Sequence, residues 1–452
     1  MNTPDTRPFR STSRRRFLRS TAAVAAAAGV LPRWFVEECD GAASPARTHP
    51  LGPNEQPAVA LVGCGGMGRG DAKNAARFGR VVAVCDVDAG NLAKARADHP
   101  GARGYADFRE VMARDDIHVV VCATVDHWHT LVSLAAMKSG KDVYCEKPLT
   151  LTVEEGQRVV KMAKRTGRIL QTGSQQRSDR SFRLACELVR NGRIGKLQHI
   201  DVWLPAGLRG GPFASTPVPE GLDWEFWQGQ TPSVPYVKER CHTTFRYWYE
   251  YSGGTMTDWG AHHNDIALWA VGLPEAANGP VSIEGRALAD TVPGGYSAFS
   301  EYEVTFGYAN GVTQTTRSTT ADNIFGGVAK PEGQRHGVKF LGSEGWIWVT
   351  RGNLQASRTE ILETPLGSDA LRLETSDDHM GNFFEGVRTR KPTICRPEVG
   401  HRSASLCHLG VIALRVGRKL RWDPVRVRFV GDREAGRYLA REQRKPWTYD
   451  LI

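Results

Sequence analysis

The 452-residue sequence lacks several features that would assign it to a specialised class of protein. Its nine cysteines are odd in number and include no CxxC pair, which argues against a disulfide framework and a zinc site, so we predict no bound metal. It also lacks a dense Lys/Arg block with interleaved aromatics, so no nucleic-acid partner is expected. No internal repeat is visible. With 40% hydrophobic and 24% charged residues, the chain is long enough for two or three globular domains.

The first 45 residues differ from the rest of the chain in charge and pattern. Seven arginines and a single acidic residue fall within 1–33, so most of the net charge of +10 is there. A Ser13-Arg-Arg-Arg-Phe-Leu-Arg19 run precedes an alanine-rich stretch over 21–31, shorter than the roughly 20 apolar residues that span a bilayer. This pattern resembles a twin-arginine export signal, which a receptor reads and which is not a stable membrane anchor. We therefore expect 1–45 to be a signal peptide and leader, the twin-arginine export machinery to be a partner, and the protein to be periplasmic or otherwise exported.

Residues 55–175 carry the pattern of a dinucleotide-binding domain. An apolar run over 58–62 predicts a strand buried on both faces, and a glycine-rich loop, a helical stretch over 71–78 and a second strand over 81–85 follow it. Asp86 ends that second strand, where a carboxylate would accept hydrogen bonds from the adenosine ribose and repel a 2′-phosphate. NAD is therefore favoured over NADP as the cofactor. The loop residues predicted to bind its pyrophosphate are Gly63, Gly65, Gly66, Met67 and Gly68.

A further buried strand is predicted over 118–122, and its C-terminal loop is rich in polar residues. Thr124 and His129 lie in this loop or at the start of the next helix, on the expected cofactor edge of the sheet. His127 and His129 flank one residue, a spacing that also occurs in metal sites. Cofactor or substrate contact is the favoured interpretation over zinc.

The pattern changes in residues 176–452, which predict an α+β domain with a large, mostly antiparallel open sheet and helices on one face. Turns are indicated at Ala309-Asn-Gly311 and over 342–345. Helices are predicted over 379–388 and 402–419, the second returning to the first domain. A long loop over 205–250 offers Arg209, Arg246 and Trp248 as candidate substrate contacts. The predicted strands cover 198–204, 281–288, 300–306, 312–318, 337–341 and 346–349.

Three polar residues share one predicted helical face in this domain. Asp258, His262 and Asp265 are spaced i, i+4 and i+7, which directs all three the same way if a helix begins near Asp258. A helix-capping Asp with a structurally satisfied His remains an alternative from spacing alone. A metal site is less favoured, because the run with His263 has no third spaced ligand cluster. Asp265 is a candidate substrate contact.

Two motifs identify a family that the chain resembles. Glu146-Lys147-Pro148 follows the last predicted strand of the first domain, and Asp258-x-x-x-His262-x-x-Asp265 lies more than a hundred residues later. Both are similar to signatures of the Gfo/Idh/MocA oxidoreductases, and the resemblance runs from about residue 58 to the C-terminus. The segments 221–227 and 400–404 look like the exported branch of this family. The resemblance implies that Glu146 and Lys147 contact the cofactor, that Lys147, Asp258 and His262 are catalytic, and that open sheet faces pair subunits into a homo-oligomer.

The expected function is NAD-dependent oxidation of a sugar, polyol or glycoside. An exported protein meets no soluble nicotinamide pool, so we expect a tightly bound cofactor that is reduced and reoxidised on the enzyme. Two alternatives stay open. One is a redox-neutral NAD-dependent glycosidase or lyase, in which oxidation is transient. The other is a non-catalytic sugar- or nucleotide-binding protein.

Overall fold

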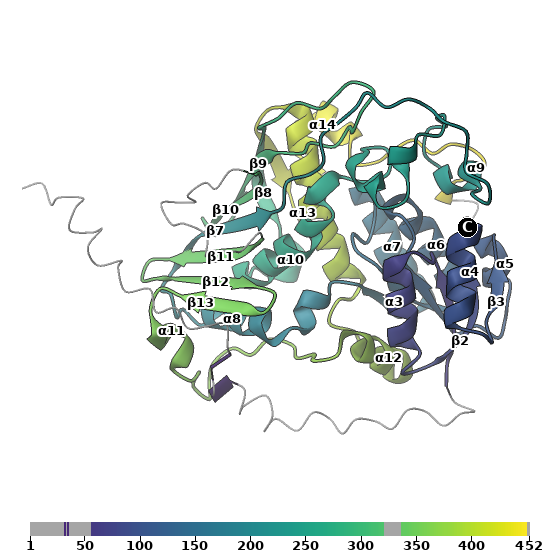
Figure 1. Ribbon diagram of the computed structural model, residues 1–452. Helices are drawn as coiled ribbons and strands as arrows, with labels where there is room; N and C mark the ends of the chain where they lie inside the picture. Colours follow the sequence, from purple (N-terminus) through teal and green to yellow (C-terminus); the bar gives the residue numbers. More distant parts are fainter. Residues whose placement is uncertain (1–30, 33, 36–55, 321–335, 450–452) are drawn as a thin grey trace, which may run out of the picture.

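The computed structural model describes residues 31–32, 34–35, 56–320 and 336–449 (Figure 1). The predicted signal and leader, apart from these first few residues, therefore lie outside the described part of the chain. Two α/β domains lie side by side, and each is built around its own sheet. Within the described residues, no helix has the length and apolarity needed to cross a membrane.

The first domain is a six-stranded parallel sheet in the order β3-β2-β1-β4-β5-β6, as a dinucleotide-binding fold requires. Every residue of its central strands β1, β4 and β5 is buried, because helices cover both faces. The strands are β1 (Ala58–Val62), β2 (Arg80–Cys85), β3 (Arg103–Tyr105), β4 (Val119–Cys122), β5 (Asp142–Cys145) and β6 (Leu170–Thr172). The helices are α3 (Gly66–Ala75), α4 (Ala89–Asp98), α5 (Phe108–Met112), α6 (Asp126–Lys138) and α7 (Val153–Thr166).

Two of these helices begin earlier than predicted. Helix α3 starts within the glycine loop at Gly66, not at residue 71, and α6 starts at Asp126, not at 130. An acidic residue in the first turn of α6 suits the positive end of the helix dipole. Both starts lie at the cofactor edge of the sheet, so helix N-termini, rather than extended loop, face that edge.

The second domain contains a nine-stranded sheet in the order β13-β12-β11-β7-β10-β9-β8-β14-β15. Neighbours are antiparallel except β7 and β10, which confirms the predicted α+β class. Strands β13 to β15 were not predicted, because they have only four, four and two residues. The strands are β7 (Leu197–Leu204), β8 (Pro280–Ala287), β9 (Tyr302–Tyr308), β10 (Thr313–Ser318), β11 (Gly337–Gly342), β12 (Trp346–Thr350), β13 (Asn353–Ala356), β14 (Leu420–Asp423) and β15 (Arg428–Phe429).

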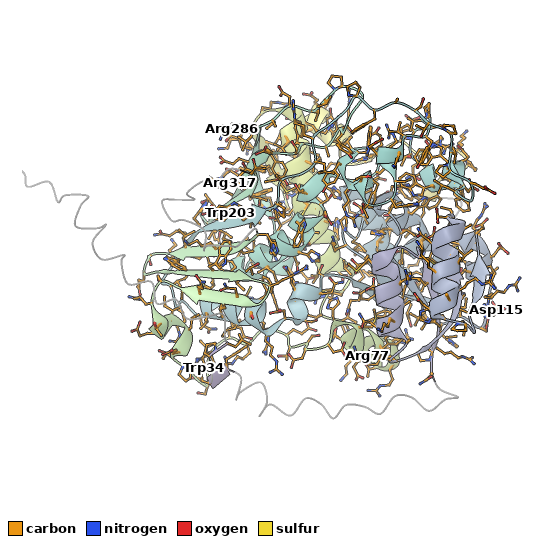
Figure 2. The ribbon with its side chains drawn as sticks, viewed as in Figure 1. Trp34, Arg77, Asp115, Trp203, Arg286 and Arg317 are labelled. Atoms are coloured by element: carbon orange, nitrogen blue, oxygen red, sulfur yellow. The ribbon has the colours of Figure 1, made fainter. Side chains whose placement is uncertain are left out.

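One face of this sheet packs against the helices α8 (Arg180–Arg190), α10 (Trp259–Val271) and α13 (Pro397–Val416). Side chains alternate along the strands, so the opposite face presents polar groups and tryptophans, among them Trp203, Arg286 and Arg317 (Figure 2). The other helices in the described residues are α9 (Trp224–Gln228), α11 (Thr359–Glu363), α12 (His379–Thr389) and α14 (Arg433–Arg437). Short 3-10 turns are η1 (Gln175–Ser178), η2 (Lys238–Arg240), η3 (Thr244–Tyr247), η4 (Gly254–Met256) and η5 (Glu275–Ala277).

Three segments of the predicted second domain pack on the first. Helix α12 covers one face of the parallel sheet beside α3 through Met380 and Phe383. Helix α13, predicted to return to the first domain, packs on α7 and also on β8. The 205–250 loop, which contains α9, crosses to the first domain, where α9 lies near α4 and α5 (Figure 1). The cofactor edge is thus covered by chain from both halves of the sequence.

Candidate active site

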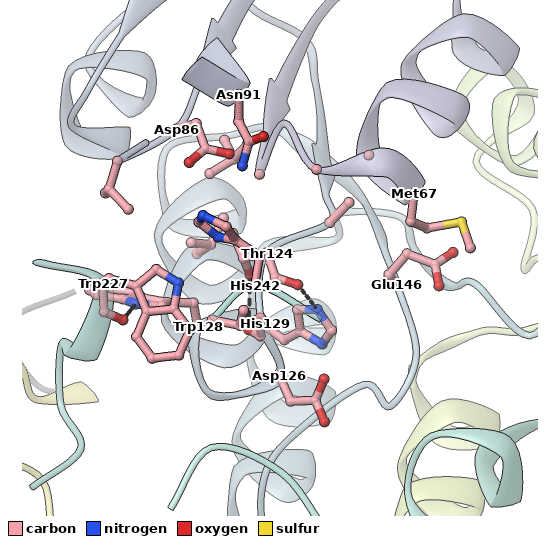
Figure 3. Close-up of a pocket in the computed structure, with 18 of the residues that line it drawn as sticks. Met67, Asp86, Asn91, Thr124, Asp126, Trp128, His129, Glu146, Trp227 and His242 are labelled. Atoms are coloured by element: carbon pink, nitrogen blue, oxygen red, sulfur yellow. Dashed lines mark hydrogen bonds between the residues drawn. The ribbon is translucent and has the colours of Figure 1, made fainter. Parts of the chain in front are cut away.

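A cavity of about 460 Å³ opens at the C-terminal edge of the parallel sheet (Figure 3). Its floor comes from the ends of β1, β2, β4 and β5, where ligands bind in open α/β sheets. Its outer wall comes from the 205–250 loop, whose cavity-lining residues are Phe226, Trp227, His242, Thr243, Phe245 and Arg246. This loop was expected to line a sugar pocket, and it forms part of the cofactor cleft.

The glycine loop fits a dinucleotide pyrophosphate. Gly63 has φ +93°, and a Cβ there would overlap with the backbone of Ala123 and Thr124, while a Cβ at Gly68 would overlap with the Gly63 carbonyl, so both positions need glycine. Gly65 and Gly66 have no atom within 4 Å of a Cβ position and so leave open space on the cavity side. Helix α3 begins there with no side-chain cap, so its first N–H groups are free to bind an anion. All five predicted loop residues line the cavity.

Asp86 is fixed where a ribose-binding carboxylate would be needed. One oxygen accepts from the Cys64 N–H at 2.7 Å and the other from the Asp88 N–H at 2.8 Å. Burial raises the pKa of Asp86, although both N–H groups oppose this effect. The carboxylate lines the cavity next to Asn91 (Figure 3). Each oxygen keeps a lone pair that can accept from a ribose hydroxyl.

Thr124 and His129 lie at the same edge, and both line the cavity. The His129 ring lies 2.7 Å from the Pro148 carbonyl oxygen and 3.2 Å from that of Thr124, which ties together the loops after β4 and β5. His127 is fully buried on another side of α6, where burial lowers its pKa to about 3. The two histidines therefore do not converge on one point. The described residues hold no group of three or more His, Cys, Asp or Glu that could bind a metal.

Glu146 lines the cavity, next to a second carboxyl group. Its Oε1 accepts from Gln175 Nε2 at 2.7 Å, and burial raises its pKa. Asp71 of α3 is also buried, and burial together with the charge of Glu146 raises its pKa to about 9. The sequence did not indicate this pairing, because the two residues are 75 positions apart.

Lys147 and Asp258 bring the two family motifs together. Lys147 Nζ lies 2.5 Å from Asp258 Oδ1, and Arg246 Nε lies 3.2 Å from the same oxygen. Burial alone would raise the pKa of Asp258, but the charges of Lys147 and Arg246 hold it below its usual value. An ionised carboxylate thus holds a lysine and an arginine at the end of the cavity, and both cations line it.

His262 lies on the first turn of α10, close enough for the Lys147 charge to act on it. Burial and then Lys147 lower its pKa well below the usual value, so the imidazole is neutral at pH 7. Its backbone carbonyl accepts from the Gln176 amide at 3.0 Å, and the amide oxygen of Gln176 accepts from Arg351 Nε at 3.3 Å. His263 points elsewhere, 3.0 Å from His336 Nδ1. Of the two histidines, His262 is the one whose pKa the Lys147 charge lowers; its side chain is buried and is not among the residues that line the cavity.

Three predicted substrate contacts lie elsewhere. Asp265 is 1% exposed and binds Arg177 through both oxygens, at 2.7 and 2.9 Å, away from the cavity. Trp248 is buried under Arg240, with its indole N–H bonded to the Glu239 carbonyl. Arg209 is exposed and donates to the Asp290 carbonyl. None of the three lines the cavity, because the loop and helix turn them toward their own neighbours; only Arg246 does.

Asp126 lines the cavity and was not predicted as a site residue. Its side chain is buried, accepts from Ser252 Oγ at 2.5 Å, and lies below His129 in Figure 3. Burial raises its pKa, while His129, Arg246 and Lys147 oppose that shift. The sequence feature that could have indicated Asp126 is its position at the start of the helix after β4, where the helix dipole favours a carboxylate.

Comparison with known proteins agrees with this geometry. Residues 58–174 match a family model described as an oxidoreductase family with an NAD-binding Rossmann fold, and 209–335 with 357–449 match the C-terminal alpha/beta domain of the same family. Inositol 2-dehydrogenase 2 of Saccharopolyspora erythraea is 37% identical over 142 residues, which is 30% of this chain and 42% of that protein. The matched region thus spans less than half of this curated relative.

Solved structures share the fold over 81% of the chain. The WlbA dehydrogenase of Bordetella pertussis, crystallised with NADH and UDP-GlcNAcA, is 18% identical, with a TM-score of 0.59 over 99% of its chain. An aldose-aldose oxidoreductase of Caulobacter crescentus, crystallised with glycerol, is 16% identical, with a TM-score of 0.58 over its whole length. At such identities the likeness establishes the fold of both domains together.

Proposed function

The chain belongs to the Gfo/Idh/MocA family of oxidoreductases, and on this premise we propose that it is an NAD-dependent enzyme oxidising a hydroxyl group of a sugar, polyol or glycoside. The observation that carries the proposal is the 2.5 Å pair of Lys147 and Asp258 at the end of the glycine-loop cavity. It joins one motif from each domain at the edge where the cofactor is expected. A binding protein without catalysis would have no need of this pair beside a neutral imidazole.

Each of the three residues has a distinct task in this reaction. Lys147 donates a hydrogen bond to the reacting hydroxyl oxygen and stabilises the negative charge that develops there. Asp258 orients the ammonium through their 2.5 Å contact. His262 is neutral, so it accepts the hydroxyl proton as the C–H bond breaks. Bound NAD supplies the two-electron acceptor for the hydrogen that leaves carbon.

The cavity suits NAD, held by the glycine loop and Asp86. We also propose export by the twin-arginine pathway, because of the arginine-rich signal in the first 45 residues. Since an exported protein meets no soluble nicotinamide pool, the cofactor stays bound through successive turnovers. A homo-oligomer paired through the open sheet face is part of the same proposal. Replacing Arg14 and Arg15 with Lys should retain the protein in the cytoplasm, which cell fractionation measures.

Two measurements test the reaction class. Mass spectrometry of small molecules released from heat-denatured, purified protein should detect NAD. Adding sugars and polyols to the NAD-loaded protein should then produce lasting absorbance of the reduced nicotinamide with at least one of them. Turnover of an aryl glycoside without net reduction would instead support a redox-neutral glycosidase. Protein that binds no nicotinamide nucleotide would contradict the proposal.

A further inference from the structure

A short segment around α9, residues 221–231, connects the second domain to the cofactor edge of the first. The Ala89 N–H donates to the Gly221 carbonyl at 2.8 Å, and the Asp223 N–H donates to the Val87 carbonyl at 3.0 Å. The Trp227 carbonyl lies 2.9 Å from both His127 Nε2 and Trp128 Nε1. The segment therefore makes hydrogen bonds at both the β2 end and the α6 end of the cavity.

The side chains of this segment form part of the cavity wall. Phe226 and Trp227 both line the cavity, and the Phe226 ring lies 6.2 Å from that of Phe108, which lines the cavity together with Asp86 and Ala106. Because Asp86 is placed to bind the adenosine ribose, this side is the adenine end, away from Lys147. A nucleotide held there would lie behind the two aromatic rings.

The C-terminal tail, residues 444–449, binds the outer side of this segment, chiefly through Arg444. The Arg444 backbone N–H donates to the Gln230 carbonyl at 2.8 Å. Its guanidinium donates to the carbonyls of Thr231 at 2.9 Å and Gly229 at 2.6 Å, and it also pairs with Glu225. One side chain thus satisfies carbonyl groups left unpaired where α9 ends.

An aromatic stack continues the contact toward the cavity. The Trp447 ring stacks on Phe226, with 5.0 Å between centroids, and meets Trp128 edge-on at 4.9 Å. Arg109 lies over the Trp447 ring at 5.1 Å. Beyond it, the Tyr449 hydroxyl donates to Glu155 of α7. The tail is therefore anchored to the first domain on both sides of the segment that it covers.

We propose that residues 221–231 and 444–449 form a clamp over the adenine end of the cavity and set how slowly NAD leaves the protein. The clamp rests on the proposed function, because it assumes that NAD occupies this cavity. Release of the adenine end would require Phe226 and Trp227 to move, which breaks the Arg444 bonds and the Trp447 stack. Since the clamp lies away from Lys147, substrates can exchange while the cofactor stays, as self-recycling chemistry requires.

The test is the rate at which NADH dissociates from the full-length protein. Protein loaded with NADH is mixed with a large excess of NAD, and the loss of bound-NADH fluorescence is followed. Arg444→Ala should release NADH about tenfold faster, since one or two net hydrogen bonds to the segment are lost. Trp447→Leu, which removes the aromatic stack and keeps Arg444, should also accelerate release. Arg433→Ala, which removes an exposed arginine of α14 outside the clamp, is the matched control and should match the wild type.

Circular dichroism and the melting temperature establish that each variant is folded before its rate is compared. Dissociation rates within twofold of wild type in both Arg444→Ala and Trp447→Leu would overturn the clamp and leave NAD binding intact. Wild-type protein that binds no NADH would overturn the proposed function, and the clamp with it. Faster release in the Arg433→Ala control as well would also overturn the clamp, because any tail substitution would then have the effect.

Discussion

Two ion pairs on α10 and its N-terminal boundary have the same chemistry and different surroundings. Asp258 pairs with Lys147 and Asp265 pairs with Arg177, and each joins this region to a segment that precedes it by about 90 to 110 residues. Asp265 is 1% exposed and uses both oxygens on one guanidinium, which also lies over the Trp269 ring. Asp258 is 19% exposed and presents one oxygen to two cations that line a cavity.

The difference teaches how a structural carboxylate is told from a functional one. Asp265 and Arg177 are buried against each other in a bidentate pair, and neither lines the glycine-loop cavity. Asp258 serves two cations through a single oxygen, and those cations keep donors that can bind a substrate. Identical residue types at regular spacing thus acquire distinct roles from their partners alone.

The largest expected effect falls on the chemistry at the first pair. Lys147→Ala or His262→Ala should lower turnover by roughly two to four orders of magnitude, the usual contribution of positioned acid–base groups. NAD affinity should stay nearly intact, because the glycine loop and Asp86 are unchanged. Steady-state rates on a confirmed substrate and NADH titration measure the two properties. Near-wild-type rates in both variants would refute the assignment of these residues.

The second pair should affect folding instead. Asp265→Asn leaves the Arg177 charge buried and unpaired, so the free energy of unfolding should fall by about 3–5 kcal/mol. Urea unfolding measures this change. Glu385→Gln removes an exposed pair with Arg388 and is the matched control, expected to change stability by less than about 1 kcal/mol. An Asp265→Asn protein as stable as the wild type would contradict the interpretation that this pair stabilises the fold.

A smaller effect is expected at the other end of the cavity. Asp86→Ala removes a ribose acceptor and a charge that repels a 2′-phosphate, so the Kd for NAD should rise by about tenfold, as for one or two lost hydrogen bonds. Affinity for NADP should fall less or improve. Fluorescence titration with both reduced nucleotides measures the ratio. Tighter binding of NADP than NAD by the wild type would show that the cofactor assignment is wrong.

The smallest effect concerns pH. The pKa of His262 lies well below 6.5, so this ring stays neutral, and able to accept a proton, as the pH falls from 7.5 to 6. Protonation of His262 should therefore cause no fall in kcat/KM over that pH interval. A base with the ordinary pKa near 6.5 would be protonated in about three quarters of molecules at pH 6. A wild-type profile that falls with an apparent pKa near 6.5, and loses this limb in His262→Gln, would contradict the shift.

Local sequence patterns were enough to predict much of the fold. The run over 58–62 is fully buried in β1 because a central parallel strand has helices on both faces, and that condition leaves a continuous apolar signature. The short strand β15 (Arg428–Phe429) could not be predicted, since its pairing with β14 depends on a partner placed by tertiary structure. The hydrophobic periodicity of α12 predicts an amphipathic helix. It does not indicate that this helix packs against the first domain.

The sequence by itself determined the glycine loop, the acid at the end of β2 and the two motifs, because each depends on residues that are neighbours in the chain. Helical periodicity also placed Asp258, His262 and Asp265 in one region. Only the tertiary structure decided that Asp265 faces Arg177 while Asp258 faces Lys147 and Arg246. It likewise decided that Phe226, Arg444 and Trp447 meet at the cavity. Ion pairing, burial and covering of a cavity depend on distances between segments far apart in sequence, and no local pattern specifies those distances.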